Sequence, residues 1–207
     1  MEWIDVSLPV NKRYPPWPGH IPFALSYHTK IEDGAEANNT YFQMSSHFCT
    51  HIDAPKHFIP DGETIETIPL SLLIGPCRVY ELNCKKAIGI SDIRNLDFHQ
   101  VKRVIFKTSN SQRIHDTEFH KDYIGIDTSA AHFLVKKGIK VLGTDYYSVA
   151  LLSEAAEVHR ILLGAKCILL EGLDLSKVKE GDYLLVALPL KITGSEAAPA
   201  RILLGRE

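Results

Sequence analysis

The segment SSHFCTHIDAPKHF, residues 45–58, brings four chemically active side chains close together in the chain: His47, His51, Asp53 and His57. Neutral imidazoles and a carboxylate that converge on one point suit a divalent cation, with zinc the first choice and manganese or iron behind it. Imidazole is also the side chain best suited to proton transfer near neutral pH. One histidine at a strand end is usually an ordinary solvated group, but four such groups in one segment favour a metal or proton-transfer site.

The local conformation decides whether these four side chains meet. Pro55 disfavours a continuous helix, because proline removes a backbone donor and pushes Ala54 out of the α region. The four positions all have odd numbers, so an extended chain would direct their side chains to one face. We therefore predict a strand through about His51, followed by a proline-directed turn that brings His57 back over the same face.

Two other uses of this segment are weaker. A closed structural zinc site favours cysteine-rich ligands, and Cys49 is the one thiol in the segment. Cys49 as a nucleophile beside a histidine lacks an accompanying oxyanion-hole pattern. An open metal site with room for a substrate is therefore the favoured interpretation.

Further ligands are expected from the second half of the chain, where His159 and Glu171 are the main candidates. His159 falls on a predicted helix that begins near Ser153, and Glu171 ends the apolar run CILLE. A charge at the end of a buried strand is costly unless it is paired or coordinated, and α/β folds bind ligands at the carboxyl ends of parallel strands. Each residue also has an ordinary explanation, as a surface histidine or a strand-end glutamate, and the residues alone leave that choice open.

The elements that position these residues change character along the chain. In the first half, four segments rich in β-branched and aromatic residues predict strands: 3–8, 23–31, 40–46 and 78–83. In the second half, four short apolar runs predict strands buried on both faces: 102–107, 139–143, 167–171 and 183–188.

Two predicted helices lie between the later strands. One is capped by Thr128 or Ser129 and stops at Gly138, and the other is capped by Ser153 and stops at Gly164. Strand, helix, strand order implies parallel pairing. We predict a mixed α/β fold, antiparallel in the N-terminal half and built of parallel βαβ units in the C-terminal half.

Composition limits the class of protein. The 207 residues fit a single domain, residues 1–207, and 45% hydrophobic with 23% charged residues is typical of a globular chain. A formal charge of -2 without a basic cluster argues against a nucleic-acid partner. The N-terminus lacks the pattern of an export signal and no apolar run approaches the roughly 20 residues of a membrane span, so we expect a cytoplasmic protein with reduced cysteines and no membrane contact.

The segment HFCTHIDAPKH resembles the signature HxGTHxDxPxH of the metal-dependent cyclase family. Three further stretches resemble conserved blocks of that family in the same order: YPPWPGH, EVHRILLGAKCILLEGLDL and LPLKITGSEAAPARILL. The chain departs from the family pattern at His20, where Asp is usual, at Cys49, where Gly is usual, and at Glu196 and Ala197, where Asp-Gly is usual. The stretch TDYYSV, residues 144–149, also differs from the family pattern.

The resemblance implies a two-metal site on a barrel-like mixed sheet. His47, His51 and Asp53 would bind one divalent ion, and Asp53, His159 and Glu171 the second, with Glu171 bridging as well. Zinc is the expected metal and manganese the alternative. The family also implies assembly as a homodimer or larger homo-oligomer.

The implied reaction is metal-dependent hydrolysis of an aryl formamide such as N-formylkynurenine to the amine and formate. His57 would act as general acid and base for metal-activated water, and Trp17 would line the pocket for an aromatic small-molecule substrate. Tyr146 and Tyr147 add bulk where the family pattern expects smaller or acidic residues, so hydrolysis of a cyclic amide or imide such as isatin is an alternative. A non-catalytic protein that binds a metal or small ligand is the alternative from another class.

Overall fold

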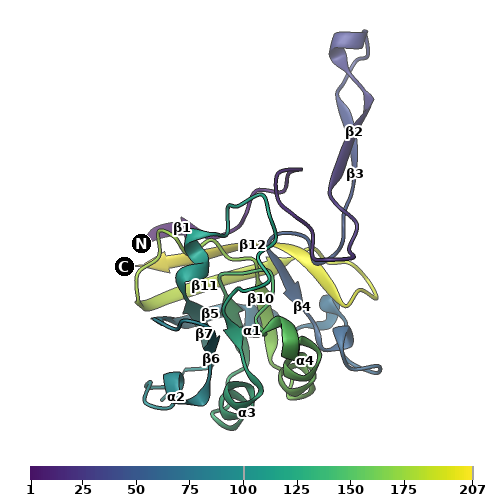
Figure 1. Cartoon of the computed structure of the whole chain (residues 1–207). Coiled ribbons are helices and arrows are strands. Elements are labelled where there is room, and N and C mark those ends of the chain that lie inside the picture. Colours follow the sequence, from purple (N-terminus) through teal and green to yellow (C-terminus); the bar gives the residue numbers. More distant parts are fainter. Residues whose placement is uncertain (100, 207) are drawn as a thin grey trace.

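A mixed β-sheet that closes on itself is the centre of the fold. A computed structural model of the chain describes residues 1–99 and 101–206. The sheet closes because β12 (Ala197–Arg206) pairs antiparallel with β11 (Gly181–Pro189) on one side and, through its first residues, with β4 (His51–Asp53) on the other. β1 (Glu2–Asp5) pairs with the second half of β12 (Figure 1).

Four strands in the middle of the sheet run parallel, as the strand and helix order predicts. They are β5 (Ile74–Glu81), β7 (Arg103–Lys107), β9 (Val141–Thr144) and β10 (Ile168–Glu171). The predicted fold class, a mixed and barrel-like α/β sheet, is confirmed. Antiparallel pairing is less confined to the N-terminal half than expected, because β11 and β12 come from the end of the chain.

The two longer helices cover one face of the parallel strands (Figure 1). α3 (Thr128–Lys136) ends before Gly138, whose φ of 77° lies in the left-handed region that glycine favours. Its cap is Asp127 and not the expected Thr128 or Ser129, because the Asp127 carboxylate accepts a hydrogen bond from the Ala130 N–H at 2.8 Å.

α4 (Ala155–Gly164) carries His159 and ends at the predicted glycine. Its expected cap, Ser153, lies inside a short 3-10 turn over Leu152–Glu154, and Glu154 takes the cap position without a capping hydrogen bond from its side chain. The helix is therefore held by its packing on the sheet, through buried residues such as Val158 and Leu162.

The remaining elements are short. The helices are α1 (Leu70–Leu73) and α2 (Ile90–Ile93), with 3-10 turns at Ile31–Asp33, Pro55–His57, Ile65–Thr67 and Ser109–Gln112; the strands are β2 (Ala24–Thr29), β3 (Asn39–Gln43), β6 (Ala87–Ile88) and β8 (Gly125–Ile126). Within residues 1–99 and 101–206, no helix has both the length and the apolar character that crossing a membrane requires.

The core has separate layers on the two faces of the sheet. In β10, Leu170 joins the cluster inside the barrel, whereas its neighbour Leu169 joins the cluster under α3 and α4. Alternation along a strand explains this division. It also determines that Glu171, two residues after Leu169, faces the helix side of the sheet.

β2 and β3 form a hairpin that projects from the body as an arm (Figure 1). Nearly every residue of the two strands is exposed. An isolated two-stranded hairpin is only marginally stable in water, so the arm has little support from its own packing.

Candidate metal centre

Strands β4 and β10 lie side by side and bring the two ends of the candidate site together. They pair antiparallel, with Glu171 opposite His51 and Leu169 opposite Asp53. Ile52, between the two ligand candidates of β4, points into the barrel core. His51, Asp53 and Glu171 therefore share the face of the sheet that α4 covers.

The local prediction for residues 47–51 is wrong in one respect. The strand begins at His51 and does not run through it, because residues 46–50 form turns and bends. Cys49 adopts a φ of 58°, in the left-handed region where glycine is favoured, which explains why the family pattern has glycine there. His47 reaches the site through this turn and not through strand alternation, whereas the predicted turn after Pro55 is present and carries His57.

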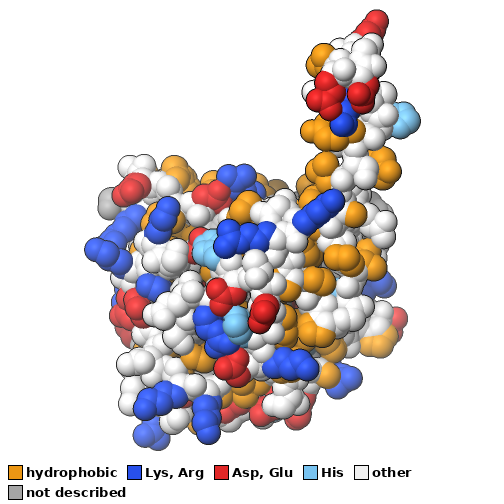
Figure 2. Space-filling model, turned by 45° about the horizontal axis from the view of Figure 1, so that its top comes forward, with side chains coloured by type: hydrophobic (Ala, Val, Ile, Leu, Met, Phe, Trp, Pro, Cys, Tyr) orange, Lys and Arg blue, Asp and Glu red, His pale blue; other side chains and the backbone are white. Residues whose placement is uncertain are grey.

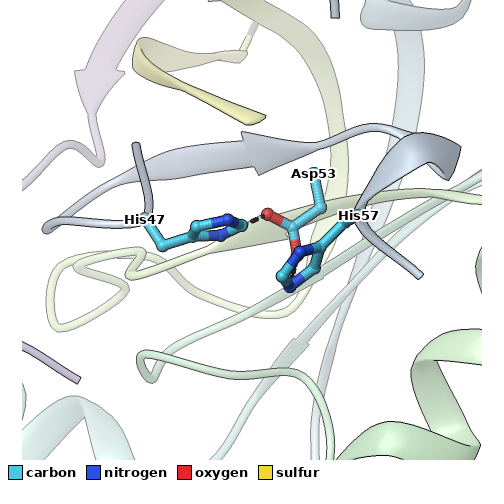
Figure 3. A group of neighbouring side chains, drawn as sticks. All are labelled: His47, Asp53 and His57. Atoms are coloured by element: carbon cyan, nitrogen blue, oxygen red, sulfur yellow. Dashed lines mark ion pairs between the residues drawn. The ribbon is translucent and has the colours of Figure 1, made fainter. Parts of the chain in front are cut away.

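Asp53 is at the centre of the cluster. Its Oδ1 lies 3.0 Å from His47 Nδ1 and 3.3 Å from His51 Nε2. Its Oδ2 lies 3.8 Å from His159 Nε2 and 4.0 Å from His57 Nε2. Figure 3 shows the Asp53 carboxylate between the rings of His47 and His57. Each oxygen of this buried carboxylate therefore faces a different pair of imidazoles.

Glu171 spans the same region with its own two oxygens. Oε2 lies 3.2 Å from His51 Nε2, and Oε1 lies 3.3 Å from His159 Nε2. Oε1 also accepts a hydrogen bond from the Val149 N–H at 2.7 Å, which fixes the carboxylate. The structure thus brings together all five ligands predicted from the sequence, including the two distant ones.

Backbone carbonyls orient two of the imidazoles. His51 Nδ1 donates to the Cys49 carbonyl oxygen at 3.0 Å, and His159 Nδ1 donates to the Ala155 carbonyl oxygen at 2.6 Å. Each neutral ring then carries its proton on Nδ1 and turns the lone pair of Nε2 toward the carboxylates. Metal-binding histidines typically have a partner of this kind on the other nitrogen.

The cluster contains polar atoms that protein groups leave unsatisfied. Among the residues that the structure describes, His51 Nε2 and both Asp53 oxygens are buried without a hydrogen-bond partner. The separations to the neighbouring groups are short, so the angles and not the distances are unfavourable. Unpaired buried lone pairs that face one another are costly, and a divalent cation among them would satisfy them. The residues present therefore fit a metal cofactor.

Protons take the place of a cation when the site is empty. Burial lowers the pKa of His47 and of His51, but Asp53 and the other adjacent carboxylates more than offset it and raise the two pKa values to about 9 and about 10. The pKa of Asp53 is held well below its ordinary value, since the nearby imidazoles outweigh the effect of burial. Both histidines are therefore protonated in the empty site at pH 7.

Zinc binding is expected to release protons at neutral pH, because a cation binds only the neutral imidazoles. The raised pKa values set the direction: affinity should increase with pH until His47 and His51 lose their protons at about 9 to 10. Calorimetric titrations at pH 7 in buffers with different ionisation enthalpies measure the release. An apparent enthalpy that is independent of the buffer would contradict this account of the site.

His57 lies beside the ligand cluster. Its ring centroid is 4.2 Å from that of His47, and its side chain is a quarter exposed. Burial lowers the pKa of His57 to about 4, because the neighbouring charge of Asp53 does not offset it and His47 lowers it further. The imidazole is thus neutral at pH 7 and able to accept a proton. His47, Asp53 and His57 also form a group with metal-ligand spacing, so the position alone is compatible with a ligand role.

A cavity of about 250 Å³ opens onto the cluster. Besides His47, His57, His159 and Glu171, it is lined by Trp17, His20, Phe58, Tyr147, Ser148, Ala155 and Ala156. Trp17 packs edge-on against Phe119, with ring centroids 5.2 Å apart, so its indole is held as a wall. Tyr146 stacks on Tyr123 in the adjacent core and does not line the cavity.

Cys49 does not fit the role of a nucleophile. Its side chain is 1% exposed, and burial raises its pKa to about 12. A nucleophilic cysteine needs an accessible thiolate, so this alternative is contradicted. Arg201, in the middle of β12, forms an ion pair with Asp5 and does not line the cavity.

Glu196 contacts His47 but was not among the ligands predicted from the sequence. Its Oε1 accepts hydrogen bonds from His47 Nε2 at 3.2 Å and from Ser46 Oγ at 2.7 Å. The only sequence signal was that the family pattern also has an acidic residue at this position.

Comparison with known proteins identifies the family of this chain. The model of the Cyclase family, described as "Putative cyclase", matches residues 4–150. This chain belongs to that cyclase family. The family resemblance predicted from the sequence motifs is therefore confirmed.

Several known proteins are similar to this chain over nearly its whole length. A kynurenine formamidase from Geobacillus thermodenitrificans is 38% identical over 200 residues, which cover 96% of this chain and 95% of the relative. A solved structure described as a potential metal-dependent hydrolase with cyclase activity is 37% identical, with a TM-score of 0.86 over 100% of this chain and 98% of the other. Isatin hydrolase A from Ralstonia solanacearum shares the fold, with a TM-score of 0.83 and 20% identity. The match covers 98% of this chain and 91% of the isatin hydrolase.

Proposed function

We propose that the chain is a metal-dependent amidohydrolase that cleaves an aryl formamide, such as N-formylkynurenine, into the amine and formate. The relatives bear out the predicted enzyme class, a hydrolase that acts on a carbon–nitrogen bond. The observation that supports the metal-dependent reaction most strongly is the convergence of unpaired His51 and Asp53 atoms from β4 with Glu171 from β10. We propose the whole chain, residues 1–207, as one catalytic domain, since the ligands span residues 47–171.

The proposed cofactor is a pair of divalent ions, zinc first and manganese as the alternative. His47, His51 and Asp53 would hold one ion, and His159 and Glu171 the other, with Asp53 facing both sets. When bound, such ions polarise a carbonyl oxygen and lower the pKa of water toward about 7. The second oxygen of Glu171 faces His51, so this carboxylate would help to hold the first ion as well.

His57 is proposed as the general acid and base. Burial lowers the pKa of its imidazole, and the side chain lines the cavity next to the ligands. It would take a proton from the attacking water at one stage and deliver it to the departing aryl amine nitrogen at the next. The bond that breaks is the amide C–N bond, and the bond that forms joins the former carbonyl carbon to the water oxygen.

Trp17 is proposed to bind the aromatic part of the substrate. Its indole lines the same cavity as His57 and is supported from behind by Phe119 and Tyr123. Offset or edge-on aromatic pairs contribute about 0.5–1.5 kcal/mol beyond the area that they bury. Phe58 also lines the cavity, so the aryl group has apolar contacts available in the pocket.

A panel of substrates tests the proposed function. Metal-loaded protein is expected to hydrolyse N-formylkynurenine and simple aryl formamides with higher kcat/KM than isatin, other lactams or cyclic imides. Preferential ring opening would favour the cyclic amide alternative. Failure of every substrate by protein that binds zinc tightly would favour a non-catalytic binding protein instead.

A homodimer or larger homo-oligomer is proposed on the basis of the β2–β3 arm. One face of the hairpin carries Leu25 opposite Phe42, with Tyr27 two residues from Leu25, and these three side chains are 40–56% exposed. Figure 2 shows apolar side chains along the arm and at its base. A second copy of the chain would cover this face. Sedimentation velocity measures the state, and a monomer at all concentrations would contradict the proposal.

A further inference from the structure

Glu196 lies at the edge of the metal centre, on the opposite side of the His47 ring from Asp53. His47 Nε2 donates to Glu196 Oε1 at 3.2 Å, and His47 Nδ1 lies 3.0 Å from Asp53 Oδ1. The two nitrogens of one imidazole therefore face two different carboxylates. Glu196, which is not one of the five proposed ligands, therefore affects which nitrogen of His47 carries the proton.

We propose that Glu196 is a positioning residue that makes Nδ1 the metal-binding atom of His47. A carboxylate can only accept, so Glu196 retains the single proton of a neutral imidazole on Nε2. The lone pair of Nδ1 is then directed at the Asp53 oxygen, where a cation would satisfy both atoms. The carboxylate also makes the imidazole a more basic ligand. This inference rests on the proposed metal function and adds a residue outside the ligand set.

The fold holds Glu196 in register with the ligand strand. Its carbonyl oxygen accepts from the Ala54 N–H at 2.9 Å, and the next residue, Ala197, pairs with Asp53 in the ladder between β12 and β4. The backbone pairing of β12 with β4 therefore fixes Glu196 and Asp53, the two residues that contact the nitrogens of His47, relative to each other.

Ser46 holds the Glu196 side chain itself, because its Oγ donates to Oε1 at 2.7 Å. Ser195 Oγ lies 3.3 Å from Oε2 but has its shorter contact, 2.7 Å, with the Ala197 carbonyl oxygen, which takes its single proton. The Glu196 side chain is 38% exposed and that of His47 is 11% exposed, so their contact is partly shielded from water. A freely moving surface glutamate would not keep one oxygen on the imidazole.

A direct ligand role for Glu196 does not fit the geometry. Its carboxylate contacts Nε2, on the far side of the ring from Asp53 and from the unpaired atoms. Of the described residues, the groups with metal-ligand spacing are His47, Asp53 and His57, and His51, Asp53 and Glu171. Glu196 belongs to neither of them.

Zinc affinity of the full-length chain, measured by competition with a chelator, tests the proposal. Glu196→Ala is expected to weaken zinc binding by about 10- to 100-fold, the effect typical of losing an outer partner of a ligating histidine. Glu196→Gln keeps an acceptor but removes the charge, so its affinity should be intermediate. Glu196→Asp, which restores the residue type usual in the family, should recover most of the affinity.

Asp116→Asn is the matched control, because it breaks another histidine–carboxylate pair, with His120 at 2.7 Å, outside the cavity. Its zinc affinity should equal that of the unchanged chain. The melting temperature of each metal-free variant separates loss of fold from loss of affinity, and the nearly isosteric glutamine variant remains informative if the alanine variant does not fold. Unchanged affinity in both the glutamine and alanine variants, or an equal loss in Asp116→Asn, would overturn the proposal. Normal zinc binding without turnover of any amide would instead refute the proposed function alone.

Discussion

His57→Ala is expected to lower kcat by about 10²- to 10⁴-fold, the usual contribution of a general acid or base, while the protein keeps its full metal content. The reason is the position of His57 on the turn after Pro55, where it lines the cavity and is 4.0 Å from the nearest Asp53 oxygen. This separation is longer than those of His47 and His51 from the same carboxylate. Steady-state kinetics and metal analysis of the same preparation measure both quantities.

His115→Ala is the matched control for His57→Ala. His115 is also paired with a carboxylate, Asp174 at 2.9 Å, but it lies outside the cavity. Its variant should retain both metal and activity. Loss of metal from His57→Ala would place His57 among the ligands, as its spacing from His47 and Asp53 also allows.

Asp53→Asn is expected to remove stoichiometric metal binding and reduce turnover to the uncatalysed level. One oxygen of Asp53 faces His47 and His51, and the other faces His159. An amide of the same size keeps the packing but removes the negative charge and replaces one acceptor with a donor. Elemental analysis of the purified variant, with the substrate panel, measures the result.

Asp145→Asn separates metal loss from general damage to the core. Asp145 is fully buried as well, but it accepts hydrogen bonds from Thr108 and Ser111, away from the cavity. Its replacement should lower the melting temperature and leave the metal content of the folded fraction unchanged. If Asp53→Asn bound two ions as tightly as the unchanged chain, the proposed bridging role of this carboxylate would be wrong.

Residue chemistry was sufficient to predict much of the site. Three imidazoles and a carboxylate within residues 47–57 were enough to predict a metal or proton-transfer site in this segment, with His51 and Asp53 among the candidate ligands. The assignment of His159 and Glu171 relied on the family motifs, because each alone had an ordinary explanation. The pairing of β4 with β10 then accounts for how these segments meet.

The positions that sequence reasoning missed depend on long-range pairing and on unusual backbone. The sequence predicted that strand alternation would bring His47 to the site. His47 does reach the site, but through a turn, because Cys49 adopts a left-handed conformation and β4 begins only at His51. β12 lies outside the predicted strands, because Pro199 is unfavourable in a strand and its tolerance there depends on the pairing partners. Glu196, which immediately precedes β12, could not be connected to His47 without that strand.

Anomalous scattering from crystals grown with zinc or manganese tests the central claim most directly. The account predicts two metal peaks on either side of the Asp53 carboxylate, one next to His47 and His51 and the other next to His159, with Glu171 beside both. An empty cluster at saturating metal, or a single ion coordinated by His57 and remote from Glu171, would contradict it.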